Sequence, residues 1–104
     1  MRKLKTKINI LGTEYKVYID TASDNKLLEK CDGFILPEKK EIYIEKDCSK
    51  KHQDQILKHE LVHAYLYESG LDVESWGRNE EIVDWIALQL EKIIKTFKEA
   101  TKKS

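Results

Sequence analysis

Hydrophobic and polar residues alternate in the first fifth of the chain. In residues 4–10 the alternate positions Leu4, Thr6, Ile8 and Ile10 face away from lysines and an asparagine. This period of two is typical of a half-buried strand. Residues 14–19 alternate in the same way, and a turn-forming segment at 11–13 separates the two runs. The pattern therefore predicts an antiparallel hairpin.

A second pair of apolar segments follows. Residues 26–30 predict one helical turn, and residues 33–36 form a short apolar run that ends at Pro37 and a charged turn. Residues 41–45 then read as a strand with Ile42 and Ile44 directed inward. We expect three or four strands in total, in a mostly antiparallel sheet.

The second half of the chain has a helical period instead. Ser49 is the expected N-cap of the first helix, with Asp47 as the alternative, and Gly70 fits the residue just past its end. Asn79 or Ser75 is expected to cap the second helix. We expect Trp76, between the helices, to plug the core or to lie at a cleft mouth. The apolar positions expected on the buried face of the second helix are Ile82, Val83, Ile86, Leu90, Ile93, Ile94 and Phe97.

These elements predict one α+β domain spanning residues 1–104, with the sheet followed by two long packed helices. Charged residues make up 37% of the chain, and 19 basic residues balance 19 acidic ones. This balance gives no argument for a nucleic acid or a membrane surface as a partner. No apolar run approaches the roughly 20 residues of a membrane helix. We expect a cytoplasmic protein in which Cys31 and Cys48 are free thiols that do not bind metal.

The segment 58–64 carries the candidate chemistry. It contains the pattern H-E-x-x-H, with His59, Glu60 and His63, on the predicted first helix. Residues four apart lie on one face of a helix, so both imidazoles can reach one ion. Zinc binds neutral imidazole nitrogen and leaves a position for water, and an adjacent carboxylate can take a proton from that water. Glu60 is therefore the candidate general base.

A catalytic zinc usually has a third protein ligand. His52 lies seven residues before His59, about 10 Å along a continuous helix, which is too far to share its ion. No cysteine follows His63. The third ligand is therefore expected among the carboxylates of residues 79–87.

The two segments together, H-E-L-V-H and N-E-E-I-V-D-W-I-A, resemble the layout of gluzincin metallopeptidases. The second segment is also similar to the E-x-x-A-N-x-F-A stretch of ImmA/IrrE-type metallopeptidases, with Glu80, Asp84 and Ala87 in register. Asp84 stands where that pattern usually has Asn. The resemblance covers roughly residues 41–95, and small phage-encoded proteins of this type have a similar length.

The resemblance implies a minimal zincin in which Zn²⁺ is bound by His59, His63 and Glu80. Glu81 stays open as a substitute ligand. Asp84 would accept a hydrogen bond from the N–H of a zinc-binding histidine. Glu60 would activate a metal-bound water that attacks a peptide bond. In zincins the strand near the metal helix is a sheet edge that pairs with substrate, which implies a substrate-binding role for Tyr43. An ordinary edge strand with an exposed Tyr43 is the alternative.

Two other functions stay open. One is a zinc-binding regulatory or interaction protein of phage or mobile-element origin with little or no peptidase activity. The other is an interaction protein without a metal. We expect the chain to lack the further lobe that supplies transition-state donors in larger gluzincins, so the oxyanion-stabilising residue is not identified. The substrate, beyond a peptide or protein, and the oligomeric state are also open.

Overall fold

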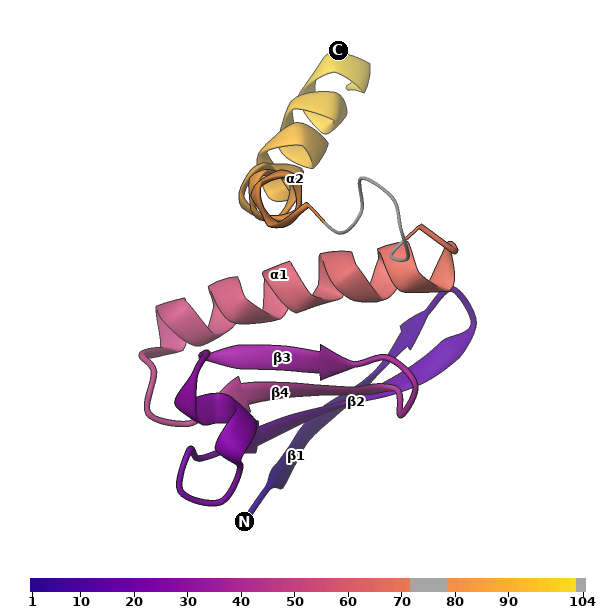
Figure 1. Ribbon diagram of the computed structural model, residues 1–104. Coiled ribbons are helices and arrows are strands. Elements are labelled where there is room, and N and C mark those ends of the chain that lie inside the picture. The colour runs from indigo at the N-terminus through magenta and orange to yellow at the C-terminus, as the bar shows by residue number, and fades with distance from the viewer. Residues whose placement is uncertain (72–78, 103–104) are drawn as a thin grey trace.

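The computed structural model describes residues 1–71 and 79–102 (Figure 1). Trp76 and Ser75, for which expectations were stated, lie outside these residues. The elements in chain order are β1 (Lys3–Ile10), β2 (Thr13–Asp20), the short 3-10 helix η1 (Lys26–Glu29), β3 (Gly33–Leu36), β4 (Glu41–Glu45), α1 (Lys50–Glu68) and α2 (Glu80–Thr101). The four strands, the helical turn and the two long helices are those expected from the sequence.

The strands form one mixed sheet in the order β1-β2-β4-β3. The β1–β2 and β3–β4 pairs are antiparallel, as expected for two hairpins, whereas β2 and β4 run parallel. The predicted α+β fold, a mostly antiparallel sheet followed by two helices, is confirmed. The expectation that residues 41–45 form a sheet edge is wrong, because β4 is paired on both sides and β3 lies at the edge.

The first hairpin is closed by a two-residue turn. Leu11 and Gly12 both have positive φ, 51° and 94°, which is the conformation of a type I′ turn. Its twist matches that of the flanking strands and sets the register that pairs Ile10 with Thr13. The register shifts between Leu4 and Thr6, and Leu4 is exposed. The predicted buried face of β1 is therefore restricted to Ile8 and Ile10.

Helix α1 lies across one face of the sheet (Figure 1). The Ser49 side chain accepts the N–H of His52, as expected for the N-cap. At the other end Gly70 has a φ of 77°, and the N–H groups of Gly70 and Leu71 bond to the carbonyls of Tyr67 and Leu66. These two bonds form a Schellman motif. The buried core between helix and sheet consists of Ile10, Tyr15, Val17, Ile42, Ile44, Ile56 and Ala64.

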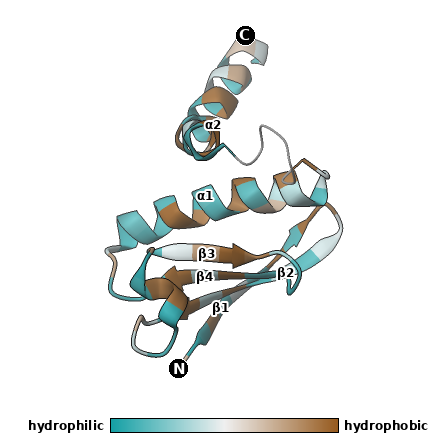
Figure 2. Ribbon diagram, in the orientation of Figure 1, coloured by the Kyte–Doolittle hydropathy of each residue, from teal (hydrophilic) through white to brown (hydrophobic). Residues whose placement is uncertain are grey.

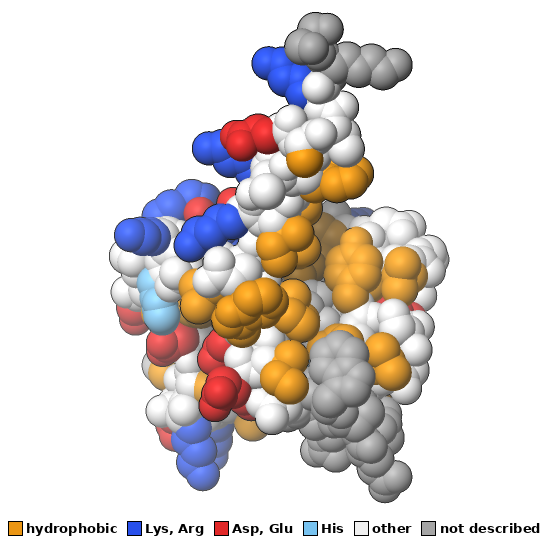
Figure 3. Space-filling model, turned by 90° about the horizontal axis from the view of Figure 1, so that it is seen from above, with side chains coloured by type: hydrophobic (Ala, Val, Ile, Leu, Met, Phe, Trp, Pro, Cys, Tyr) orange, Lys and Arg blue, Asp and Glu red, His pale blue; other side chains and the backbone are white. Residues whose placement is uncertain are grey.

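Helix α2 packs on the other side of α1, so the molecule has three layers (Figures 1 and 2). Asn79 caps it by accepting the N–H of Ile82. Val83 and Ala87 are buried in a second small core. Most of the expected buried face is instead exposed, namely Ile82, Leu90, Ile93, Ile94 and Phe97. Figure 3 shows hydrophobic side chains gathered on this side of the molecule. The prediction fails at positions 93–97 because the C-terminal end of α2 extends away from α1 (Figure 1).

Neither long helix is apolar enough over its length to cross a lipid bilayer, within the described residues.

Strand β3 lies very close to α1. A Cβ placed on Gly33 would stand 2.3 Å from Cγ2 of Ile56 and 3.0 Å from the carbonyl oxygen of Tyr43. Ile56 is β-branched and almost fully buried, so its side chain has little freedom to move aside. Gly33 therefore allows the edge strand to approach the helix.

We predict that Gly33→Ala lowers the free energy of unfolding by about 1–3 kcal/mol, because it overpacks the contact between β3 and α1. Urea denaturation of Gly33→Ala, Ile56→Ala and the double variant provides the measurement. The double variant should lose less stability than the sum of the single losses, because the alanine at position 56 leaves room for the new Cβ. Additive losses would contradict this explanation.

The C-terminus of α1 is tied to the sheet through Glu68. Its carboxylate accepts hydrogen bonds from Lys40 Nζ at 2.8 Å, Tyr15 Oη at 2.6 Å and Thr13 Oγ1 at 3.1 Å. The bond from Lys40, followed by that from Tyr15, lowers the pKa of Glu68 below its ordinary value of 4.5. Burial, followed by the contact with Glu68, raises the pKa of Tyr15. The carboxylate is thus favoured in the folded protein.

A carboxyl whose pKa is lower in the folded state adds stability above its unfolded pKa and loses it as pH falls. We therefore predict that Glu68→Gln lowers the melting temperature at pH 7 and that its difference from wild type shrinks as pH falls below about 4.5. Thermal unfolding followed by circular dichroism across this range measures both effects. Glu14→Gln, an exposed change on β2, is the control and should show neither. A Glu68→Gln difference independent of pH would refute the assignment.

Candidate metal centre

The H-E-x-x-H segment lies in the middle of α1, where the helix faces both α2 and the start of β3. His59 and His63 are one turn apart, with ring centroids 4.9 Å from each other. Glu60 and His63 are buried, at 6% and 8% exposed. The helical period thus places two imidazoles and a carboxylate at a junction of apolar surfaces, as the sequence predicted.

Glu80 brings a second carboxylate to the histidines from α2. Its oxygens lie 2.9 Å from Nε2 of His59 and 3.0 Å from Nε2 of His63. The cap at Asn79 makes Glu80 the first residue of α2, the end of the helix that favours acidic side chains. Glu80 thus contacts both rings from α2. It is the residue that the resemblance implied as the third metal ligand.

Asp84 contacts the opposite nitrogen of His59. Its Oδ1 lies 2.6 Å from Nδ1 of that ring. An ionised carboxylate can only accept, so Nδ1 of His59 carries the proton. In a neutral imidazole this leaves a lone pair on Nε2, directed at Glu80. Asp84 therefore selects the tautomer of His59 that can bind a metal through Nε2.

The two Nε2 atoms and Glu80 enclose a point that a proton or a cation must share. Lone pairs and carboxylate oxygens at about 3 Å repel each other unless a proton or cation lies between them. A proton on Nε2 of His63 can donate to Glu80 from a neutral ring, whereas His59 already carries a proton on Nδ1 and would become imidazolium if Nε2 also donated. One divalent cation at this point would instead bind the Nε2 atoms of two neutral rings.

The donor set suits zinc. Zinc binds imidazole nitrogen and carboxylate oxygen at about 2.0–2.2 Å, so tetrahedral ligands lie about 3.3–3.6 Å apart. The N–O separations of 2.9 and 3.0 Å fall a few tenths of an ångström short of that spacing. Glu80 is mostly exposed, with 65% of its side chain accessible, so its carboxylate can adjust. His59, His63 and Glu80 therefore fit a zinc ion with small movements.

Glu60 is the second carboxylate beside the histidines. One of its carboxylate oxygens lies within 4.8 Å of a ring nitrogen of both His59 and His63. At that separation a water can bridge between the carboxylate and an ion held by the rings. The geometry thus brings carboxylates from both helices, Glu60 and Glu80, to the two histidines.

A cleft opens over this centre between α1, α2 and β3. It has a volume of about 530 Å³. The segment around β3 lines it with Cys31, Gly33, Phe34, Ile35 and Pro37. The two helices line it with His59, Glu60, His63 and Glu80. The candidate metal-binding residues thus face a space that could hold a small molecule or a peptide segment.

Tyr43 does not belong to this cleft, which corrects the substrate-binding role implied for it. It lies on the inner strand β4, is 5% exposed, and stacks between Tyr18 and Phe34. Residues 42 and 44 face α1, so alternation along the strand directs Tyr43 to the opposite face of the sheet. There its hydroxyl accepts from Arg2 at 2.6 Å and donates to Glu41 at 3.1 Å.

The sequence reasoning missed the residues of β3 as part of the site. The apolar run 33–36 was recognised as a strand, but alternation does not reveal which strand of a sheet is at its edge. Gly33 was the one available signal, because a glycine within a strand often marks a close approach of backbone to another group.

No family model, curated protein or solved structure matches the chain. The assignment of a function therefore depends on the geometry described above.

We predict that Asp84→Asn lowers the affinity for Zn²⁺ by about 10–100-fold, because an amide holds the tautomer and the basicity of His59 less well than a carboxylate does. Competition with a chromophoric chelator measures the change. Asp54→Asn, an exposed change elsewhere on α1, is the control. Equal affinities of Asp84→Asn and wild type would show that Asp84 does not support the metal centre.

Proposed function

We propose that the chain is a zinc-dependent peptide-bond hydrolase. The observation that carries the proposal is the convergence of Glu80 on the Nε2 atoms of His59 and His63, with Asp84 on the opposite nitrogen of His59. This arrangement sets two imidazole nitrogens and a carboxylate around one point, with Glu60 beside them.

Zinc, when bound to His59, His63 and Glu80, supplies a Lewis acid that polarises a carbonyl and acidifies water. Glu60 would accept the proton of the attacking water and deliver it to the amide nitrogen as the C–N bond breaks. Glu60 is 6% exposed and lies beside both histidines, within reach of a water that a bound ion would hold.

The outer edge of β3, which no strand of residues 1–71 and 79–102 pairs with, supports a peptide substrate. The Asp32 carbonyl accepts the N–H of Glu45 at 2.8 Å, so residues 32 and 45 form a hydrogen-bonded pair. Bonded and non-bonded pairs alternate along an antiparallel ladder. Gly33 and Ile35 therefore direct their N–H and C=O groups away from β4, toward the open edge beside the cleft. An extended peptide could add to the sheet there.

A zinc-binding protein that acts by interaction is the second candidate. The observation favouring it is the exposed apolar surface on the C-terminal half of α2, which includes Ile93 and Phe97. Both candidates use the same ligands and differ in whether Glu60 is needed. We place either activity in the cytoplasm, a compartment that suits the two free thiols.

We predict that Glu60→Gln retains one zinc at this centre and lowers the rate of peptide cleavage by about 10²–10⁴-fold, because the amide cannot accept the proton. The measurements are zinc content and hydrolysis of a quenched fluorescent peptide library by the zinc-loaded protein. His59→Ala should lose both the zinc and the cleavage.

Glu91→Gln, an exposed change on α2, is the matched control and should match wild type in both measurements. Cleavage by wild type that survives in Glu60→Gln would refute the proposed role of Glu60. Zinc binding without cleavage of the library or of unfolded casein by wild type would favour the second candidate. Absence of zinc at this centre would overturn both.

A further inference from the structure

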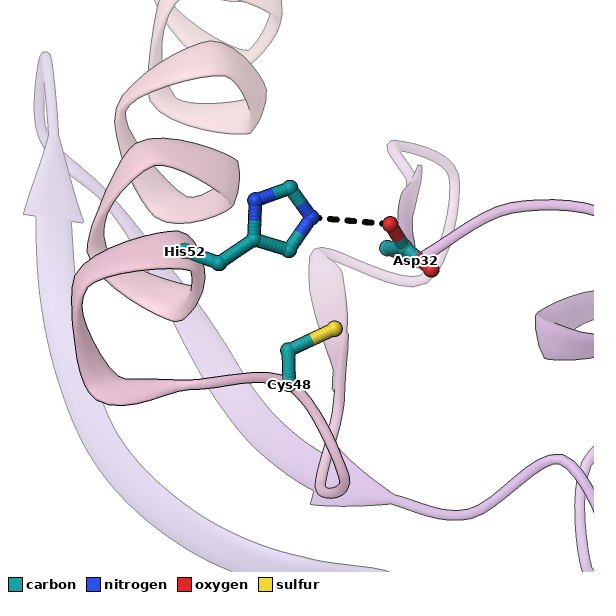
Figure 4. Close-up of side chains that lie close together, drawn as sticks. All are labelled: Asp32, Cys48 and His52. Atoms are coloured by element: carbon teal, nitrogen blue, oxygen red, sulfur yellow. Dashed lines mark hydrogen bonds and ion pairs between the residues drawn. The ribbon is translucent and has the colours of Figure 1, made fainter.

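A second group of metal-ligating side chains lies near the N-terminus of α1. Asp32 precedes β3, Cys48 lies in the connection between β4 and α1, and His52 is in the first turn of α1. One ligand atom from each lies within 4.8 Å of the other two. Figure 4 shows the Cys48 thiol directed toward the gap between the His52 ring and the Asp32 carboxylate, which are 2.8 Å apart.

The backbone holds all three residues in place. The Ser49 cap fixes the start of α1, between Cys48 and His52. The side-chain amide of Gln53 donates to the carbonyls of Glu45, Lys46 and Cys48, which fastens the connection before the helix. The carbonyl of Asp32 accepts from Glu45. The three ligands therefore converge from positions that are already ordered.

The surroundings of the thiol are acidic. Burial, followed by the nearby carboxylates of Asp32, Glu45 and Asp47, raises the pKa of Cys48. The same carboxylates attract a cation. A bound divalent cation would displace the thiol proton to solvent, so that the sulfur becomes a thiolate ligand.

We propose that Asp32, Cys48 and His52 form a second site for a divalent cation of the zinc class, with a fourth position left to solvent. Sulfur, imidazole nitrogen and carboxylate oxygen together are a ligand set that zinc accepts and that magnesium and calcium do not favour. His52 lies two helical turns before His59, so the site shares no ligand with the candidate metal centre. The proposal does not depend on peptidase activity.

An ion at this second site would join the start of β3 to the first turn of α1. Asp32 and His52 line the same cavity, of about 550 Å³, as His59 and Glu60. Gly33, the next residue after Asp32, is the one that touches Ile56 of α1. The ion would therefore hold the edge strand against the helix that carries the candidate metal centre.

Cobalt(II) separates the two sites spectroscopically, because only a site with a thiolate gives a sulfur-to-cobalt charge-transfer band in the near ultraviolet. We expect the metal-free full chain to bind two equivalents of Co²⁺, one of which produces this band. Cys48→Ser should lose the band and one equivalent. Cys31→Ser, at the exposed neighbouring cysteine, is the matched control and should keep both. His63→Ala should keep the band and lose the other equivalent.

His52→Ala is a second test, and this variant should fold because 47% of the His52 side chain is exposed. It should weaken the band-producing site and leave the far-ultraviolet circular dichroism unchanged. A wild type without the band at saturating Co²⁺ overturns the proposal. The proposal is also overturned if the band persists in Cys48→Ser or disappears in Cys31→Ser. A band of unchanged strength in a folded His52→Ala would overturn it as well. If wild type binds only the band-producing equivalent of Co²⁺ and lacks the one that depends on His63, this inference stands and the proposed function fails.

Discussion

The contact of α1 with the sheet on one side and with α2 on the other is the constraint on which the site depends. One helix must present Ile56 and Ala64 to the sheet, and Val62 and Leu66 to α2. His59 and His63 lie where these two apolar surfaces meet, which excludes water from part of each ring. The same packing that stabilises the fold therefore also positions the rings for which a shared cation is proposed.

In the proposed function, carboxylates with different surroundings divide the chemistry between them. Glu80 is largely exposed and would move onto an ion, whereas Glu60 is buried and would exchange a proton with water. Asp84 accepts the N–H of Nδ1 of His59 and so determines which ring nitrogen carries the proton. This division depends on two helices meeting at one point, because neither helix carries the whole set. The peptide-binding edge proposed for β3 adds a third element to the same junction.

Local chemistry explains what could be predicted from the sequence. The caps at Ser49 and Asn79 and the i, i+4 spacing of His59 and His63 depend only on neighbouring residues. Sheet order depends on contacts between distant segments, so the parallel pairing of β2 with β4 and the burial of Tyr43 were not predictable. Helical periodicity identified an apolar face on α2 but not how far α1 would cover it. Asp32, Cys48 and His52 also come from separate segments, so their clustering was not predictable, and Cys48 was expected not to bind metal.

The small core between α1 and α2 has a thermodynamic consequence. Val83 and Ala87 are the buried apolar residues that the described part of α2 contributes. Little hydrophobic free energy therefore holds this helix in its orientation, and an ion bound by His59, His63 and Glu80 would add a strong link between the two helices. Assembly of the third layer and occupancy of the metal centre would then be two aspects of one equilibrium, with the concentration of free metal setting how much of the protein has its last helix in place.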